Sequence, residues 1–250
     1  MCDVNTGKES SLGSHDKAVR SLVYNANREL LVSGSWDSTV KFWDARSSTC
    51  TASCPLPNKV FAMAGTDQRI VVGLAGRQVL VYDLRNLSAP EQQRESSLKY
   101  QTRALSCFPD GTGFVVGSIE GRVAVEFFDP KPEAQAQKYA FKCHRSSANG
   151  VDTTYPVNAI AFHKQFGTFA TGGCDGQIYV WDAKNKKRLC QLRKYPTSIA
   201  GIAFNESGTA MAVASSYTFE EGEKQGVPPD QLFIRAVNEA EVKPKQKPQQ

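Results

Sequence analysis

The chain has 250 residues, of which 40% are hydrophobic and 22% are charged, an ordinary globular composition. No stretch approaches the roughly 18 apolar residues of a membrane helix. The polar N-terminal segment, residues 1–11, lacks the apolar core of a signal peptide. The formal net charge of +5 favours acidic partners but is too small to argue for nucleic-acid binding.

The seven cysteines are scattered and lie mostly in strand-like runs, so we expect reduced, packed thiols in a cytosolic or nuclear protein. Cys50 and Cys54 lie close together, but no second cysteine or histidine pair completes a zinc set. Phosphate-loop, HExxH and EF-hand patterns are missing as well. The sequence therefore predicts neither a metal nor a cofactor.

Four stretches align with one another, and each begins with glycine, turns tightly and continues into a β-rich strand: residues 34–44, 73–83, 117–127 and 172–182. Their last residues, 44, 83, 127 and 182, are spaced by 39, 44 and 55 residues. The last spacing is long because an insertion at about residues 146–155 precedes the fourth unit. A period near 40 to 45 that ends in Trp-Asp is the signature of WD repeats.

Each stretch follows two strand-like runs separated by turn-forming residues such as Asn25, Asp67 and Asp110. A further strand follows it, for example residues 187–192. Four antiparallel strands make one propeller blade. A fifth unit has strands at 198–204, 209–214 and 231–237, a polar loop at 217–230 and no fourth strand.

The predicted fold is an all-β WD-repeat β-propeller over residues 1–240, built of four-stranded antiparallel blades. The five blades are expected at about 15–55, 56–97, 98–143, 144–194 and 195–237. Residues 8–12 are expected to form a lone outer strand. This strand could complete the fifth blade and close a five-blade ring; an open arc that lacks blades is the alternative. Residues 241–250, rich in Lys, Pro and Gln, are expected to be a disordered basic tail.

Two of the three histidines occupy matching repeat positions, and each precedes a hydroxyl residue, an aspartate and a tryptophan. WD-repeat proteins lock their blades with a buried hydrogen-bond set of this kind, because buried polar groups must find partners. The sequence predicts two such sets: His15, Ser33, Asp37 and Trp43, and His144, Thr171, Asp175 and Trp181.

With this assignment, the serine, histidine and aspartate residues of these sets are parts of the scaffold and do not form a nucleophilic triad. His163 lies in the turn Phe162–Phe166 with no carboxylate beside it, so we expect a surface residue. The sequence therefore predicts a binding platform and not an enzyme.

Positions that deviate from the repeat are candidates for function, because the scaffold does not need them. In the turn before the third strand, Trp36 aligns with Ala75, Ile119 and Cys174, which predicts a partner contact. Packing against a neighbouring blade is the alternative for Trp36.

A lone arginine, Arg122, occupies the next variable site of the repeat. Arg145 follows His144 at the position where Asp16 follows His15, so the charge there is reversed. With Lys142, and with Arg77 as an extension, they are expected to form a basic patch for an acidic or phosphorylated peptide. A solvated charge is the alternative reading of Arg122.

Several words in the sequence resemble the family of Bub-kinase-binding WD-repeat proteins of the mitotic spindle checkpoint. They are GSWD at 34–37, RESSLKYQTR at 94–103, GSIEGRVAVE at 117–126, YAFKCHR at 139–145, NKKRLC at 185–190, YPTSIA at 195–200 and ASSY at 214–217. The sister family of messenger-RNA-export WD-repeat proteins shares SIEGRV and FKCHR but is less similar elsewhere.

The resemblance implies a nuclear protein, also cytoplasmic, that reaches kinetochores in mitosis. Its top face would bind a GLEBS-type segment of Bub-family checkpoint kinases and phosphorylated kinetochore-scaffold motifs. The mitotic checkpoint complex and the anaphase-promoting complex would be further partners. Trp36 and Arg122 match family positions that hold the kinase segment, and Arg145 matches one associated with the phosphate. The alternative is an RNA-export factor that binds a nucleoporin GLEBS segment and RNA.

The resemblance also implies seven blades, of which about five are present here. The roughly 80 to 90 residues of two further blades would carry part of the partner surface and the closing strand. Ring closure by five blades and an open arc therefore both stay open.

Overall fold

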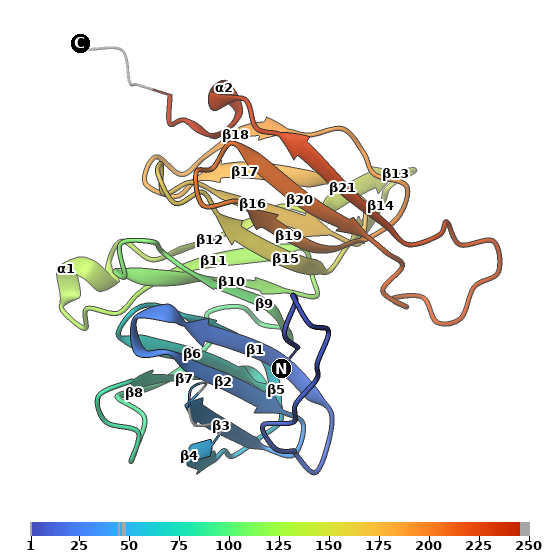
Figure 1. Ribbon diagram of the computed structural model, residues 1–250. Coiled ribbons are helices and arrows are strands. Elements are labelled where there is room, and N and C mark those ends of the chain that lie inside the picture. The colour runs from blue at the N-terminus through green and yellow to red at the C-terminus, as the bar shows by residue number, and fades with distance from the viewer. Residues whose placement is uncertain (1, 45, 47–48, 246–250) are drawn as a thin grey trace. The chain divides into compact units, whose positions relative to one another are not determined.

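Antiparallel β-sheets make up nearly all of the structure (Figure 1). The computed structural model describes residues 2–44, 46 and 49–245. Within them, four sheets have four strands, one has three strands and one is a two-stranded hairpin. The predicted all-β propeller class of four-stranded antiparallel blades is confirmed. No helix in these ranges is long and apolar enough to cross a membrane. The chain divides into two units, Met1–Ser96 and Ser97–Gln250.

The first unit holds two sheets and two single-turn 3-10 helices. One sheet consists of β1 (Val19–Asn25), β2 (Leu30–Ser35), β3 (Thr39–Asp44) and β4 (Thr49–Pro55), with a 3-10 turn at Ala26–Arg28. The other consists of β5 (Val60–Gly65), β6 (Arg69–Leu74), β7 (Gln78–Asp83) and β8 (Gln92–Glu95), with a 3-10 turn at Ala75–Arg77. Their facing sides share one apolar core, which includes Val32, Phe42, Val60 and Ile70.

The second unit holds three sheets, a hairpin and two short helices. The first of its sheets consists of β9 (Thr102–Cys107), β10 (Gly113–Ser118), β11 (Arg122–Phe127) and β12 (Tyr139–Lys142). The second consists of β15 (Val157–Phe162), β16 (Phe169–Gly173), β17 (Ile178–Asp182) and β18 (Lys187–Gln191). The third consists of β19 (Ile199–Phe204), β20 (Ala210–Ser215) and β21 (Gln231–Ala236). The hairpin is β13 (Arg145–Ala148) and β14 (Val151–Thr154). The helices are α1 (Pro132–Gln135) and α2 (Glu239–Val242).

Neighbouring sheets in a unit approach closely because a glycine on the second strand of one sheet receives a branched side chain from the first strand of the next. A Cβ atom added to Gly172 would lie 2.4 Å from Cγ2 of Ile199, and one added to Gly117 would lie 2.9 Å from Cγ1 of Val157. Strands covered on both faces read as continuous apolar runs, and every residue of β10 is buried. These contacts bury the apolar surface that stabilises the fold.

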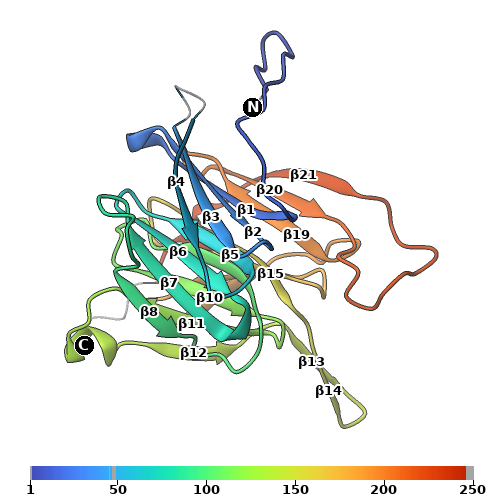
Figure 2. The same cartoon turned by 90° about the horizontal axis from the view of Figure 1, so that it is seen from below.

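The insertion expected at about residues 146–155 forms the β13–β14 hairpin, which projects from the sheets (Figure 2). All four residues of β14 are exposed, as are Ser146, Ser147 and Ala148 of β13. The hairpin therefore adds surface to the unit and contributes little to its core.

Two expectations at the ends of the chain are wrong. Residues 8–12 form no strand; Glu9 forms an isolated β-bridge with Cys2. An outer strand needs a continuous ladder of hydrogen bonds to a sheet edge, and an isolated bridge to the preceding turn is not such a ladder.

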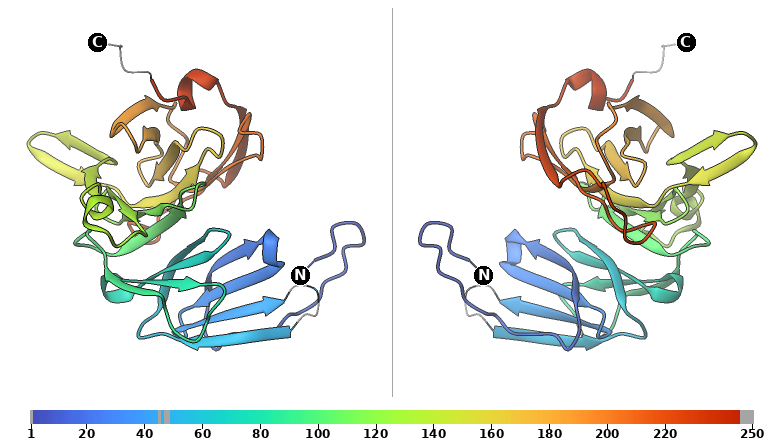
Figure 3. Two further views of the ribbon diagram at one scale, coloured as in Figure 1. Left: turned by 90° about the vertical axis from the view of Figure 1, so that its left-hand side faces the viewer. Right: turned by 90° about the vertical axis from the view of Figure 1, so that its right-hand side faces the viewer.

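The basic tail was expected to begin at residue 241, but Glu241 and Val242 belong to α2, which packs against β17 and β18 (Figure 3). Asn238 and Glu241 form a capping box, and Val242 is 1% exposed. The prediction failed because it rested on the Lys- and Pro-rich composition of the segment and overlooked the capping box and Val242. Residues 246–250 of the expected tail lie outside the described residues.

The close approach of sheets predicts that Gly172→Ala is destabilising. The added methyl group meets Ile199 at 2.4 Å, so strands β16 and β19 must separate, at a cost of about 1–3 kcal/mol in the free energy of unfolding. Gly201→Ala is the matched control, because its Cβ would meet only Ala214 at 3.8 Å. Urea unfolding of the two variants should separate them, and equal stability would contradict the packing role of Gly172.

Candidate functional site

The first predicted hydrogen-bond set is present in the first unit. His15 lies 2.8 Å from Asp37 through Nδ1 and 2.7 Å from Ser33 through Nε2. Trp43 donates from Nε1 to the same Ser33 hydroxyl at 2.8 Å. A consistent proton arrangement has Nδ1–H donating to the carboxylate and Nε2 accepting from Ser33. The set ties the segment before β1 to β2 and β3.

The second set is present in the second unit with the same geometry. His144, which is fully buried, lies 2.9 Å from Asp175 through Nδ1 and 2.9 Å from Thr171 through Nε2. Trp181 donates to Thr171 at 2.9 Å. Both imidazoles are thus held by structural partners on each ring nitrogen.

The expectation that His163 is a surface residue is wrong, since its exposure is 2%. Its Nδ1 accepts from the backbone N–H of Phe166 at 3.4 Å, so Nε2 carries the proton and donates to the carbonyl of Gly208 at 3.2 Å. The ring also stacks on Phe166 and meets Phe204 edge-on. The partner Gly208 comes from the next sheet, and nothing in the local turn sequence indicates it.

Three of the five predicted partner-binding residues meet at one end of the β9–β12 sheet. Arg122 and Lys142 face each other across β11 and β12. The turn before β11 packs on the segment that carries Arg145, and the close approach requires glycine at Gly121. A Cβ atom there would lie 2.3 Å from the carbonyl oxygen of His144. We call Arg122, Lys142 and Arg145 the basic patch.

One acidic residue that the sequence did not single out, Glu120, sits within the basic patch. Its carboxylate lies 3.6 Å from Nε of Arg122, and its backbone carbonyl accepts from Arg145 at 3.1 Å. The Nε atoms of Arg122 and Arg145 are buried and have no hydrogen-bond partner within the described chain. A repeat alignment could have shown Glu120, because it stands where the first and fourth units have Asp37 and Asp175.

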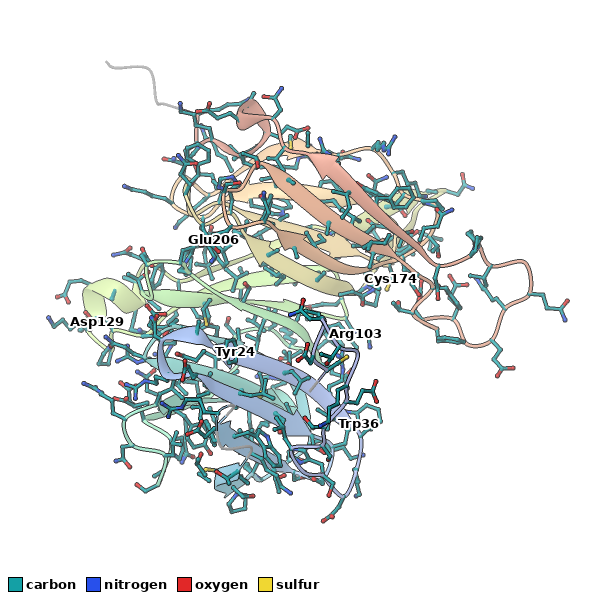
Figure 4. The ribbon with its side chains drawn as sticks, in the orientation of Figure 1. Tyr24, Trp36, Arg103, Asp129, Cys174 and Glu206 are labelled. Carbon is teal, nitrogen blue, oxygen red and sulfur yellow. The ribbon has the colours of Figure 1, made fainter. Side chains whose placement is uncertain are left out.

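The other two predicted partner-binding residues, Trp36 and Arg77, belong to the first unit. Trp36 is 42% exposed in the turn between β2 and β3 (Figure 4), and Lys59 lies 5.8 Å over its ring. Arg77 pairs with Glu95 at the end of β8. Trp36 therefore keeps an accessible apolar surface, while the charge of Arg77 is already partnered.

Sequence reasoning missed a polar network at the ends of the three sheets in the second unit. Asn158 accepts from Arg103 at 3.0 Å and donates to Cys174 at 3.1 Å and to Thr218 at 3.2 Å. Figure 4 marks Arg103 and Cys174 at this end. Burial raises the pKa of the Cys174 thiol, which keeps it neutral. The repeat pattern gives no signal for this network, because its members come from different repeats and a loop.

The loop at 217–230 bounds a cavity of about 330 Å³ beside this network. Charged and aromatic side chains line it, among them Tyr155, Lys194, Tyr217, Glu220 and Lys224. Its Glu220 accepts from Thr218 at 2.8 Å and from Ser198. The internal polar contacts order the loop, which the sequence indicated only as an interruption.

Comparison with known proteins gives closely similar relatives over nearly the whole chain. Mitotic checkpoint protein BUB3.1 of Arabidopsis thaliana is 57% identical over 97% of this chain and 73% of its own length. Mitotic checkpoint protein bub3 of Dictyostelium discoideum is 50% identical over 97% of this chain and 74% of its own length. The chain belongs to the Bub3 family.

More distant comparisons agree with this placement. The family "WD domain, G-beta repeat" matches residues 7–44 and 137–182. The mRNA export factor GLE2 of Chaetomium thermophilum is 36% identical over 98% of this chain and 70% of its own, so the export proteins form a sister group of the Bub3 family. A chain in the crystal structure of a mitotic checkpoint complex superimposes with a TM-score of 0.73 at 16% identity, which supports the fold; the match covers 87% of this chain and 64% of that one.

The first hydrogen-bond set predicts an acid-sensitive contribution to stability. Burial alone would raise the pKa of Asp37, but hydrogen bonds from Thr39 and His15 outweigh it and lower the pKa to about 2. The contribution, on the order of 2 kcal/mol, is therefore present above the unfolded pKa near 4 and is lost as the pH falls toward 2. Asp37→Asn should remove this pH dependence. Urea unfolding at pH 5 and pH 2.5 tests it, and parallel losses in both proteins would contradict the assignment.

Proposed function

We propose that this chain is a non-enzymatic WD-repeat adaptor of the mitotic checkpoint, whose basic patch binds an acidic or phosphorylated peptide. The observation that carries the proposal is that Arg122, Lys142 and Arg145 lie at one end of the β9–β12 sheet, where Nε of Arg145 is buried without a hydrogen-bond partner and Nε of Arg122 is ion-paired with Glu120 at 3.6 Å. Family membership supports the cellular process, because relatives in Arabidopsis, Dictyostelium and Caenorhabditis elegans are named mitotic checkpoint proteins.

The chemistry of the basic patch favours an anion with several oxygens. A guanidinium group donates along two parallel directions, which matches a phosphate or carboxylate. A buried donor without a partner costs free energy, and a ligand oxygen that accepts from it recovers that cost. Lys142 is exposed at the same end and adds a third positive charge. A phosphothreonine in an acidic peptide is our proposed ligand.

The identity of the two ligands is proposed from the sequence motifs that resemble the family. We propose that Trp36 provides an apolar anchor for a GLEBS-type segment of a Bub-family kinase, since its ring is partly exposed in a tight turn. Large aromatic side chains of this kind dominate binding energy at protein interfaces. In this proposal the phosphorylated peptide comes from the kinetochore scaffold, and the protein acts in the nucleus and at kinetochores.

Charge reversal in the basic patch is expected to abolish peptide binding. Arg122→Glu and Arg145→Glu each remove a charge-assisted hydrogen bond, so the Kd for a threonine-phosphorylated acidic peptide should rise about 10- to 100-fold. Fluorescence anisotropy with the labelled peptide measures this, and its unphosphorylated form shows the share due to phosphate.

Lys164→Glu is the matched control, because it makes the same charge change in the turn between β15 and β16, where Lys164 pairs with Glu206. Unchanged affinity in Arg122→Glu would contradict the proposed contact. Salt-sensitive binding of RNA without peptide binding would instead favour the export function of the 36% identical relatives.

Removal of the negative charge of Glu120 is expected to strengthen binding of the phosphopeptide. Its carboxylate competes with an anionic ligand for Arg122, at a separation of 3.6 Å. Glu120→Gln keeps the size of the side chain and the backbone contact to Arg145, so affinity for the phosphopeptide should increase about 2- to 5-fold, as for loss of a surface ion pair. The same titration measures it, and weaker binding would show that Glu120 orients Arg122 for the ligand.

A further inference from the structure

The β13–β14 hairpin begins in the basic patch, because its first residue is Arg145. The strand register of this hairpin is fixed at both ends. At the base, the backbone N–H of Tyr155 donates to the carbonyl of His144 at 2.9 Å. At the tip, Asn149 and Gly150 have positive φ angles of 52° and 75°, as the two central residues of a type I′ hairpin turn require.

With this register, Thr154 lies directly opposite Arg145. Directly opposed residues of an antiparallel pair point to the same face, with Cβ atoms about 4.5–5.5 Å apart. Thr154 is exposed, and its hydroxyl has no hydrogen-bond partner among the described residues. Arg145 donates to the carbonyl of Glu120, and its Nε is buried without a hydrogen-bond partner in the described chain. A free threonine hydroxyl therefore lies beside an arginine that has unused donors.

The other hydroxyl residues of the hairpin are placed differently. Ser146 and Thr153 oppose each other on the other face, since side chains alternate along a strand. Ser147 lies on the same face as Thr154 but opposes Asp152, whose carboxylate would repel a phosphate. Thr154 is therefore the hydroxyl residue of this hairpin that opposes a cation.

Strand β14 is accessible to a modifying enzyme. All four of its residues are exposed, and the hairpin projects from the sheets (Figure 2). β14 pairs with β13 alone, and an isolated two-stranded hairpin is only marginally stable in water. The strand can therefore separate locally and enter an active-site cleft as an extended segment.

We propose that Thr154 is a phosphorylation site, whose phosphate binds Arg145 and blocks the basic patch against anionic peptides. A protein serine/threonine kinase transfers the γ-phosphoryl group of ATP to the threonine. The bond from Oγ1 to phosphorus forms, the bond to the ADP oxygen breaks, and the hydroxyl proton passes to the catalytic aspartate of the kinase. The product has a charge of about −1.5 to −2 at pH 7 and three acceptor oxygens, which suit a bidentate contact with a guanidinium group.

The phosphate has two effects on the basic patch. It accepts from the donors of Arg145, and its charge offsets the positive charges of Arg122 and Lys142 beside it. The contact between the phosphate and Arg145 depends on the hairpin geometry alone. The effect on peptide binding rests on the proposed function, so the two parts need separate measurements.

Phosphorus NMR of the full chain carrying Thr154→phosphothreonine tests the contact without any peptide. A neighbouring guanidinium favours the doubly charged phosphate, so the second pKa of this phosphate should lie below its usual value of about 6. Arg145→Gln in the same chain should return the pKa to its usual value.

Thr153→phosphothreonine is the matched control, because it adds the same charge to the same strand on the opposite face. Its phosphate pKa should stay near the usual value. Opening of the hairpin by a phosphate would affect both modified chains alike, so it cannot produce a difference between them. Equal pKa values in the two modified chains would overturn the contact with Arg145.

Fluorescence anisotropy with the threonine-phosphorylated acidic peptide tests the effect on binding. Thr154→phosphothreonine should raise the Kd at least about 10-fold, whereas Thr153→phosphothreonine should change it less than about 2-fold. Equal affinity of the two modified chains would overturn the regulation. If the unmodified chain does not bind the peptide, the regulation falls with the proposed function, and the NMR titration still decides the phosphate contact.

Mass spectrometry of the chain recovered from dividing cells and from cells arrested in mitosis tests whether the site is used. Trypsin cleaves after Arg145 and Lys164, so one peptide, residues 146–164, carries the whole set of hairpin hydroxyls. Its fragment spectrum should place a phosphate on Thr154. Absence of phosphate from Thr154 in both samples would overturn its assignment as a modification site.

Discussion

Each of the two units depends on one contact that is repeated between its neighbouring sheets. A branched side chain from the first strand of a sheet enters the space above a glycine on the second strand of the preceding sheet, as Val60 does at Gly34 and Ile199 at Gly172. The absence of a Cβ atom lets the two backbones approach closely. Middle strands are then covered on both faces, and the buried area stabilises sheets that would not be stable alone.

This packing fixes the strands but leaves the turns between them free to vary. The His15 and His144 sets fasten two of those turns through buried hydrogen bonds, in which every polar atom has a partner. His144 is followed directly by Arg145, and its carbonyl packs on Gly121 beside Arg122. The structural set therefore positions the basic patch, and a scaffold residue determines where two functional candidates lie.

The candidate residues lie where the repeats differ from one another. Trp36, Glu120 and Arg145 occupy turns or strand ends that the sheet contacts do not constrain. The β13–β14 hairpin and the loop at 217–230 are also additions to a repeat, and neither contributes to the shared cores. A chain of this kind can acquire a partner surface without disturbing its packing, because binding residues and core residues occupy different parts of each blade.

The sequence by itself determined the repeat, the strands and the two histidine sets, because each depends on local periodicity or on matching positions in the repeat. It did not determine the environment of His163, which a carbonyl from the next sheet buries. It also missed α2, where a capping box and Val242 outweigh the polar composition around them. Whether Arg122, Lys142 and Arg145 converge depended on strand register and on the turn at Gly121. Only the tertiary structure decided these points, because each depends on groups that are distant in sequence and meet when the sheets stack.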